Sequence, residues 1–199
     1  MGTAQSQPGP ADIVMMNAVD LSNAIHTKQV SCVEVMTAYL DHIGRINPKV
    51  NAIVSLQDRD DLLAQARERD EVLARGEPLG WMHGFPQAPK DLLAAQGLPT
   101  TQGSPIFKDF VSTTDAIIVE RAKRSGAIII GKTNTPEFGA GSQTFNEVFG
   151  ATHNPYDLTK TCGGSSGGAA AALACGLVPL ADGSDLGGCL LYTSPSPRD

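Results

Sequence analysis

The chain has 199 residues, of which 41% are hydrophobic, and its 15 Lys and Arg against 21 Asp and Glu give a net charge of −6. The acidic balance argues against nucleic acid or an anionic membrane as a direct partner. No apolar run approaches the ~18 residues that a membrane-spanning helix needs. The four cysteines form no CxxC pair, and the four histidines complete no metal-binding pattern with them. We therefore expect a cytoplasmic protein with reduced thiols and no metal.

The first part of the chain predicts a disordered lead-in followed by helices. Residues 1–11 are rich in Pro, Gly and Gln and lack the layout of a secretory signal. Apolar residues at helical spacing then predict two helices before residue 50. Ser31 followed by Glu34 has the spacing of a capping box and predicts the start of the second, which "NPK" at 47–49 is expected to end. Residues 58–78 predict a third helix, charged on its outer face.

Beyond residue 80 the pattern changes to short apolar segments separated by Gly, Pro and Thr. Residues 116–135 predict a helix, a glycine turn and a buried strand at 127–130. Residues 163–185 predict a glycine-rich loop, a short helix of small residues, a stop at Gly176 and a strand at 177–181. Alternating helices and apolar strands indicate an α/β sandwich.

One motif, "GAIIIGKT" at 126–133, matches the phosphate-loop pattern G-x-x-x-x-G-K-T. Its context contradicts that interpretation, because the four residues between the glycines are themselves the predicted strand and Pro136 follows too soon for a helix. We interpret Lys132 as an ordinary strand-end lysine and keep a nucleotide-binding module as a less favoured alternative.

Three further segments each have an ordinary and a functional interpretation. "GGSSGG" at 163–168 is either a flexible turn or a rigid loop at a helix N-terminus, where amide hydrogens favour negative charge. "APKDLL" at 88–93 contains either a salt-bridged lysine or one whose pKa burial lowers from ~10.4 toward neutrality, so that it can act as a base. "ADGSDLGG" at 181–188 is either a bend or a set of backbone amides able to form an oxyanion hole.

Taken together, these segments resemble the amidase signature family over nearly all of residues 12–188. "GWMHGFPQAPKDL" at 80–92 and "GKTNTPEFGAGSQTFNEVFGATHNP" at 131–155 carry the same resemblance. The resemblance implies an α/β/α sandwich around a mixed sheet, of which this chain holds an incomplete N-terminal portion. It also implies an amidase that cleaves the C–N bond of a small linear carboxylic amide through an acyl-enzyme.

The resemblance assigns a Ser–cis-Ser–Lys triad to three positions. Lys90 matches the lysine that acts as the base, and Ser165 matches the serine that follows a cis peptide bond and relays the proton. The nucleophile falls 24 residues later, where this chain has Cys189 and the family has a serine. Further positions implied are an oxyanion hole at Leu186, Gly187 and Gly188, and a substrate-bordering loop that includes Gly139, Gly141 and Ser142.

The end of the chain departs from the family pattern. "CLLYTSPSPRD" at 189–199 resembles the in-frame translation of a transposon-end sequencing adapter. Our hypothesis divides the chain into a lead-in at 1–11, a partial amidase domain at 12–188 and a non-native tail at 189–199, and we expect this fragment to be inactive and to expose apolar surface. The alternative is that Cys189 is genuine and acylates through its thiolate.

The functional alternatives remain open at this point. Besides a free amidase, the family includes subunits of amidotransferases that deliver ammonia from glutamine, and a scaffold that has lost its nucleophile is a third possibility. The resemblance implies no cofactor, a small-molecule amide substrate, no direct contact with nucleic acid or a membrane, and a possible homodimer.

Overall fold

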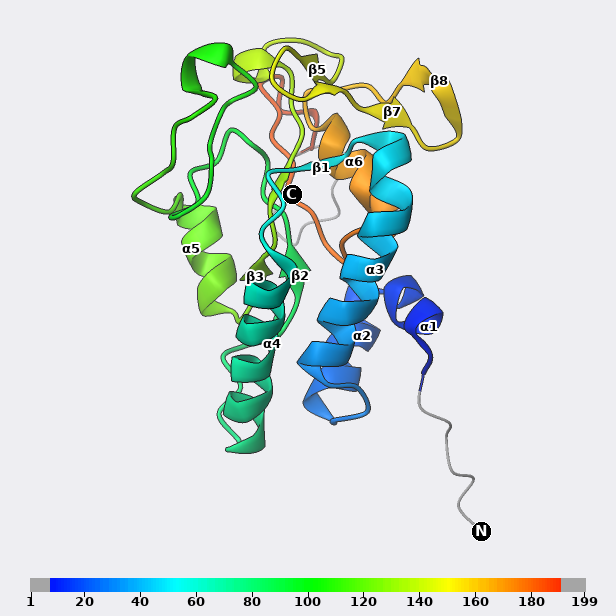
Figure 1. Ribbon diagram of the computed structural model, residues 1–199, viewed down its shortest axis with the longest axis vertical. Coiled ribbons are helices and arrows are strands. Elements are labelled where there is room, and N and C mark those ends of the chain that lie inside the picture. The colour runs from blue at the N-terminus through cyan, green and yellow to red at the C-terminus, as the bar shows by residue number, and fades with distance from the viewer. Residues whose placement is uncertain (1–7, 191–199) are drawn as a thin grey trace.

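The computed structural model describes residues 8–190 and begins with a helical layer (Figure 1). This layer contains α1 (Pro10–Met15), α2 (Ala18–His26), α3 (Cys32–Val50) and α4 (Arg59–Ala74). Three helices, not two, thus precede residue 51, because the chain becomes extended at Met16 and Asn17 then caps α2 by accepting from the Asp20 amide at 2.9 Å. Helix α1 already begins within the expected lead-in, whose residues 1–7 lie outside the described residues.

The capping box predicted at the start of α3 is confirmed, whereas the predicted end of this helix is wrong. The Ser31 hydroxyl accepts from the Glu34 amide, and the Glu34 carboxylate accepts from the Ser31 amide at 2.8 Å. The helix continues past Pro48 to Val50 and ends at Asn51, whose backbone is left-handed. The Asn47 side chain bonds to the backbone of Ala52 and Ile53, just beyond the helix, and fixes how the chain leaves it.

Four short strands, β1 (Ile53–Val54), β2 (Pro86–Gln87), β3 (Ile128–Ile129) and β4 (Lys132–Thr133), form two adjoining two-stranded sheets. Strand β3 pairs with β2 in parallel, and β4 pairs with β1 antiparallel. Thr133 also forms a parallel bridge with Lys90, so the segment 128–133 has a parallel neighbour on one edge and an antiparallel neighbour on the other. The buried strand predicted at 127–130 is confirmed as β3, which covers Ile128–Ile129.

The strand predicted at 177–181 is wrong. Within the described chain these residues pair with no strand, although Leu177 and Val178 are buried in the core. A strand needs backbone partners on a neighbouring strand, which the local sequence cannot supply. Residues 177–181 instead lead from the end of the preceding helix into the segment that contains Asp182.

The remaining elements surround the two sheets and their upper end in Figure 1. They are η1 (Pro105–Phe107), α5 (Ile117–Arg124), η2 (Glu137–Gly139), β5 (Phe145–Asn146), β6 (Gly150–Ala151), β7 (His153–Asn154), β8 (Asp157–Thr161) and α6 (Gly167–Ala174). Strands β2 and β3 run between α5 on one side and α2 and α3 on the other (Figure 1). The predicted mixed α/β class is therefore confirmed. Over residues 8–190, no helix combines the length and the apolar content that crossing a bilayer requires.

Candidate active site

The site is centred on Lys90, which lies just beyond β2 and bridges to Thr133 of β4. The Lys90 side chain is completely shielded from solvent (0% exposed). Its Nζ lies within hydrogen-bond distance of three hydroxyl groups, Ser165 Oγ at 2.8 Å, Ser166 Oγ at 3.0 Å and Ser184 Oγ at 2.8 Å. Burial lowers the pKa of Lys90, because the charged amine loses its hydration. The amine is therefore buried among three hydroxyl groups.

Tight packing at the start of α6 positions the serine loop. The peptide bond between Gly164 and Ser165 is cis. A Cβ atom at Gly168 would lie 2.4 Å from the backbone nitrogen of Asn134, so only glycine permits this approach. Gly167 donates its N–H to Thr144 Oγ1 at 3.1 Å, which holds the first turn of the helix. The loop is thus rigidly held, as its composition of small residues predicts.

The three hydroxyl groups around Lys90 are not equivalent. A neutral amine has two N–H groups and one lone pair, so at least one of the three hydroxyls must donate to it. Ser166 Oγ donates to the Ser184 carbonyl at 3.3 Å and accepts from the Ser184 amide at 3.1 Å. Its proton is therefore already engaged. Ser165 and Ser184 are the hydroxyls whose protons can point at the neutral amine.

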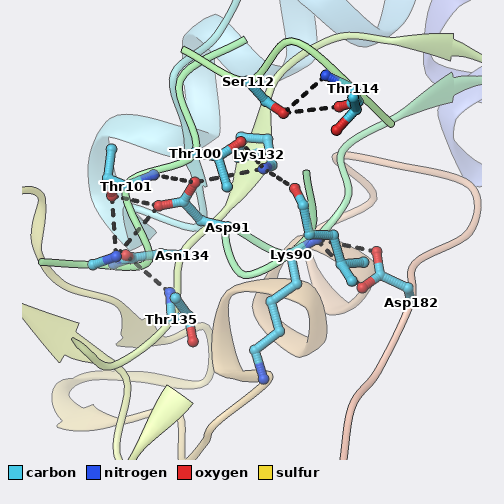
Figure 2. Close-up of polar contacts among 12 residues, drawn as sticks. Lys90, Asp91, Thr100, Thr101, Ser112, Thr114, Lys132, Asn134, Thr135 and Asp182 are labelled. Carbon is cyan, nitrogen blue, oxygen red and sulfur yellow. Dashed lines mark hydrogen bonds and ion pairs between the residues drawn. The ribbon is translucent and has the colours of Figure 1, made fainter. Parts of the chain in front are cut away.

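A carboxylate, Asp182, holds the backbone of Lys90. Its two oxygens accept the Lys90 N–H at 3.2 and 3.3 Å (Figure 2). Burial raises the pKa of Asp182, and its negative charge acts on Lys90 in the direction that raises the pKa of the amine, against the effect of burial. Asp182 therefore links the Lys90 strand to the segment that carries Ser184, both mechanically and electrostatically.

Asp91, the residue after Lys90, points away from Asp182 and pairs with Lys132 (Figure 2). The Asp91 carboxylate lies 3.6 Å from Lys132 Nζ, and both side chains are fully buried. Lys132 also donates to the Leu93 carbonyl and to Thr100 Oγ1 at 3.3 Å. Lys132 lies on a strand and is structural, in agreement with its interpretation as an ordinary strand-end lysine, but the sequence did not predict its buried ion pair with Asp91.

A cavity of about 830 Å³ lies against the serine loop. Its wall includes the predicted residues Ser165, Gly139, Gly141, Ser142, Leu186 and Cys189. Gly187 and Gly188 do not line it. The Gly187 amide donates to Asp185 Oδ1 at 2.9 Å, and the Gly188 amide donates to the Asp185 carbonyl at 3.3 Å. Two of the three amides predicted to form an oxyanion hole are thus bonded within their own loop.

The sequence profile of the amidase family matches residues 34–191. This chain belongs to the amidase family. The A subunit of glutamyl-tRNA(Gln) amidotransferase from Azoarcus sp. (strain BH72) is 48% identical over 176 residues, which cover 87% of this chain and 36% of that protein. Indoleacetamide hydrolase of Bradyrhizobium diazoefficiens is 42% identical, covering 88% of this chain and 33% of its own length. The chain thus spans about a third of the length of these relatives.

Solved structures show the same likeness. Fatty acid amide hydrolase superimposes with a TM-score of 0.85 at 27% identity, covering 91% of this chain and 32% of its own. A 6-aminohexanoate cyclic dimer hydrolase complexed with substrate superimposes with a TM-score of 0.78 at 32% identity, covering 89% of this chain and 35% of its own. Both comparisons agree with the family assignment and with the share of the fold that the chain represents.

Three polar residues of this site are not predicted by the sequence. Ser166 and Ser184 bond to the Lys90 amine, and Asp182 binds the Lys90 backbone. Ser166 is adjacent to the predicted Ser165, and the other two lie in the segment "ADGSDLGG", which was interpreted as a bend or as backbone amides for an oxyanion hole. Their hydroxyl and carboxyl groups are a visible signal, but the approach of Asp182 and Ser184 to Lys90 joins residues more than 90 positions apart along the chain.

Proposed function

We propose that this chain supplies the base and the proton relay of an amidase that hydrolyses small linear carboxylic amides. One observation carries the proposal: the Lys90 amine is fully buried and lies 2.8 Å from Ser165 Oγ, which borders the same cavity as residue 189. A desolvated amine next to a hydroxyl at the wall of a cavity is suited to general base catalysis.

In the proposed reaction, the nucleophile at position 189 attacks the amide carbonyl and transfers its proton to Ser165 Oγ, while Ser165 transfers its own proton to Lys90 Nζ. The carbonyl π electrons move to oxygen and form the tetrahedral oxyanion. The oxyanion collapses as the C–N bond breaks, and Lys90 returns the proton through Ser165 to the leaving nitrogen, which departs as ammonia or an amine. Water then attacks the acyl-enzyme by the same route and releases the carboxylic acid.

The oxyanion would be stabilised by backbone amides at Leu186, Gly187 and Gly188, each worth on the order of 3 kcal/mol. Because the Gly187 and Gly188 amides donate to Asp185, this part of the proposal requires their release when substrate binds. Asp185 also accepts from the Leu190 amide at 3.0 Å, so the same carboxylate fixes the start of the turn that carries residue 189. Substrate would therefore compete with Asp185 for these two donors.

The identity of the nucleophile belongs to the proposal. We propose that the native residue at 189 is a serine and that the 199 residues alone give no turnover. The resemblance of 189–199 to an adapter supports this, although residues 191–199 lie outside the described residues. Sequencing the locus beyond the codon for Gly188 tests the idea: a serine codon followed by coding sequence supports it, and a stop codon after Asp199 refutes it.

A second candidate function is that of one component of an amidotransferase. The 48% identity to the glutamyl-tRNA(Gln) amidotransferase protein favours it, whereas the similarity to indoleacetamide hydrolase favours a free amidase. The two differ in what they need. A free amidase releases ammonia from simple amides by itself, and an amidotransferase component would release it from glutamine only with its partner subunits.

The decisive experiment measures ammonia release by the full-length protein, read from the same locus, with simple aliphatic and aromatic amides and with glutamine. Lys90→Met and Ser165→Ala should each lower kcat/KM by about 10²–10⁴-fold, the range of general acid–base contributions. Lys160→Met, which removes a largely exposed lysine (71%) of β8, is the matched control and should leave the rate unchanged. A Lys90→Met enzyme that keeps the wild-type rate would refute the proposal.

A further inference from the structure

Asp182 is placed where its charge, and not only its hydrogen-bonding capacity, bears on the reaction. Among residues 8–190, it is the carboxylate whose charge acts on the Lys90 amine. Asp91, the next residue after Lys90, points to the other side of the strand and is paired with Lys132 (Figure 2). The charge of Asp182 also acts on Lys132, in the direction that raises its pKa. The charged groups near Lys90 are therefore Asp182, which binds the Lys90 backbone N–H, and the Asp91–Lys132 pair on the other side of the strand.

A purely structural role would not require a carboxylate. The Lys90 N–H needs one acceptor, and a neutral amide oxygen can accept it. Asp182 instead offers both carboxylate oxygens to that N–H in a partly buried position where burial raises its pKa, so the ionised form is disfavoured there. The hydrogen bond from the Lys90 N–H offsets part of this cost, and the ionised carboxylate adds a negative charge that a neutral acceptor would not supply.

We propose that Asp182 is a positioning residue that supplies the counter-charge for Lys90, stabilising the ammonium that forms when Lys90 accepts the proton from Ser165. This inference rests on the proposed function, because it matters only if Lys90 is the base. A negative charge fixed near the place where positive charge develops lowers the energy of the transition state. The same charge holds a proton on Lys90 at low pH, so Asp182 also determines where the base becomes available.

The first test measures the titration of Lys90 directly in the 199-residue chain, by the ¹³Cε chemical shift of the lysines, with Lys90→Met used to assign the signal. Asp182→Asn keeps an acceptor for the Lys90 N–H and removes the charge. The titration midpoint of Lys90 should then move to lower pH by on the order of one unit. Asp157→Asn, which changes an aspartate on the distant β8 hairpin, is the control and should not move it. An unchanged midpoint in Asp182→Asn overturns the inference.

The unmodified chain provides a second measurement that does not depend on how well the variant folds. If the two groups are coupled, the Lys90 signal shows an inflection at the pH where the Asp182 ¹³Cγ signal titrates. Absence of that inflection also overturns the inference.

Turnover of the full-length enzyme separates this inference from the proposed function. With Asp182→Asn, kcat should fall and the acidic limb of its pH profile should move to lower pH, a shift that loss of packing alone would not produce. A normal rate in Lys90→Met refutes the proposed function whatever the NMR shows. An unmoved acidic limb in Asp182→Asn, in an enzyme that does need Lys90, refutes only the counter-charge.

Discussion

The buried pair of Asp91 and Lys132 predicts a large effect of a single substitution, Asp91→Ala. Both side chains are 0% exposed. The Asp91 carboxylate also accepts from the Thr101 amide at 3.2 Å, from the Thr101 hydroxyl and from the Gly103 amide at 3.4 Å. The substitution leaves a buried ammonium with the Leu93 carbonyl and the Thr100 hydroxyl as its partners, and it removes the acceptor that organises residues 101–103.

The expected loss of stability depends on whether the substitution breaks a buried or an exposed ion pair. Removing one member of a buried ion pair costs about 3–5 kcal/mol, since the other charge remains without compensation. An exposed pair contributes at most about 1 kcal/mol. Asp41, whose side chain is 62% exposed and lies 2.8 Å from Arg59, provides the matched control. We expect Asp91→Ala to lower the free energy of unfolding by several times more than Asp41→Ala.

The assay is urea denaturation of the 199-residue chain at pH 7, followed by circular dichroism. The double variant Asp91→Leu/Lys132→Met removes both charges and should recover much of the lost stability, because apolar residues of similar size can replace a buried pair. Equal losses in Asp91→Ala and Asp41→Ala would refute the reasoning. A double variant no more stable than Asp91→Ala would show that the hydrogen bonds to residues 101–103, and not the charge, dominate.

Two further predictions concern packing and pH. Gly168→Ala should destabilise the chain by about 1–3 kcal/mol, because the new Cβ would lie 2.4 Å from the Asn134 nitrogen. Gly44→Ala, on an exposed turn of α3 with no atom within 4 Å of the new Cβ, should instead stabilise the chain by about 0.5–1 kcal/mol. A higher melting temperature for Gly168→Ala than for Gly44→Ala would contradict this prediction. In the full-length enzyme, kcat should rise with pH through the lowered pKa of Lys90, since the amine is a base only when neutral. The free energy of unfolding should also increase with pH between the lowered pKa of Lys90 in the folded chain and the ordinary pKa of lysine. In this range Lys90 carries a proton in the unfolded chain but not in the folded one. A rate that falls over the same range would exclude Lys90 as the base.

Local sequence predicted the features that depend on local interactions. The Ser31–Glu34 capping box is complete within four residues, so its residues suffice to place the start of α3. The strand at 127–130 followed from an apolar run between glycines. Short helix α1 was missed because six residues give little periodic signal, and the end of α3 was missed because the helix continues through Pro48 to Val50.

The site divides in the same way between sequence and tertiary structure. The residues of the motif segments were visible in the sequence, and their resemblance to one family led to Lys90 and Ser165 as candidates. The sequence did not predict that Asp182 and Ser184 reach Lys90, that Asp91 turns away to pair with Lys132, or that 177–181 forms no strand. Each of these depends on a partner far along the chain. Hydrogen bonds within a turn are determined by neighbouring residues. The partner of a buried charge is determined only by tertiary folding, because the charge needs a partner once the core excludes water.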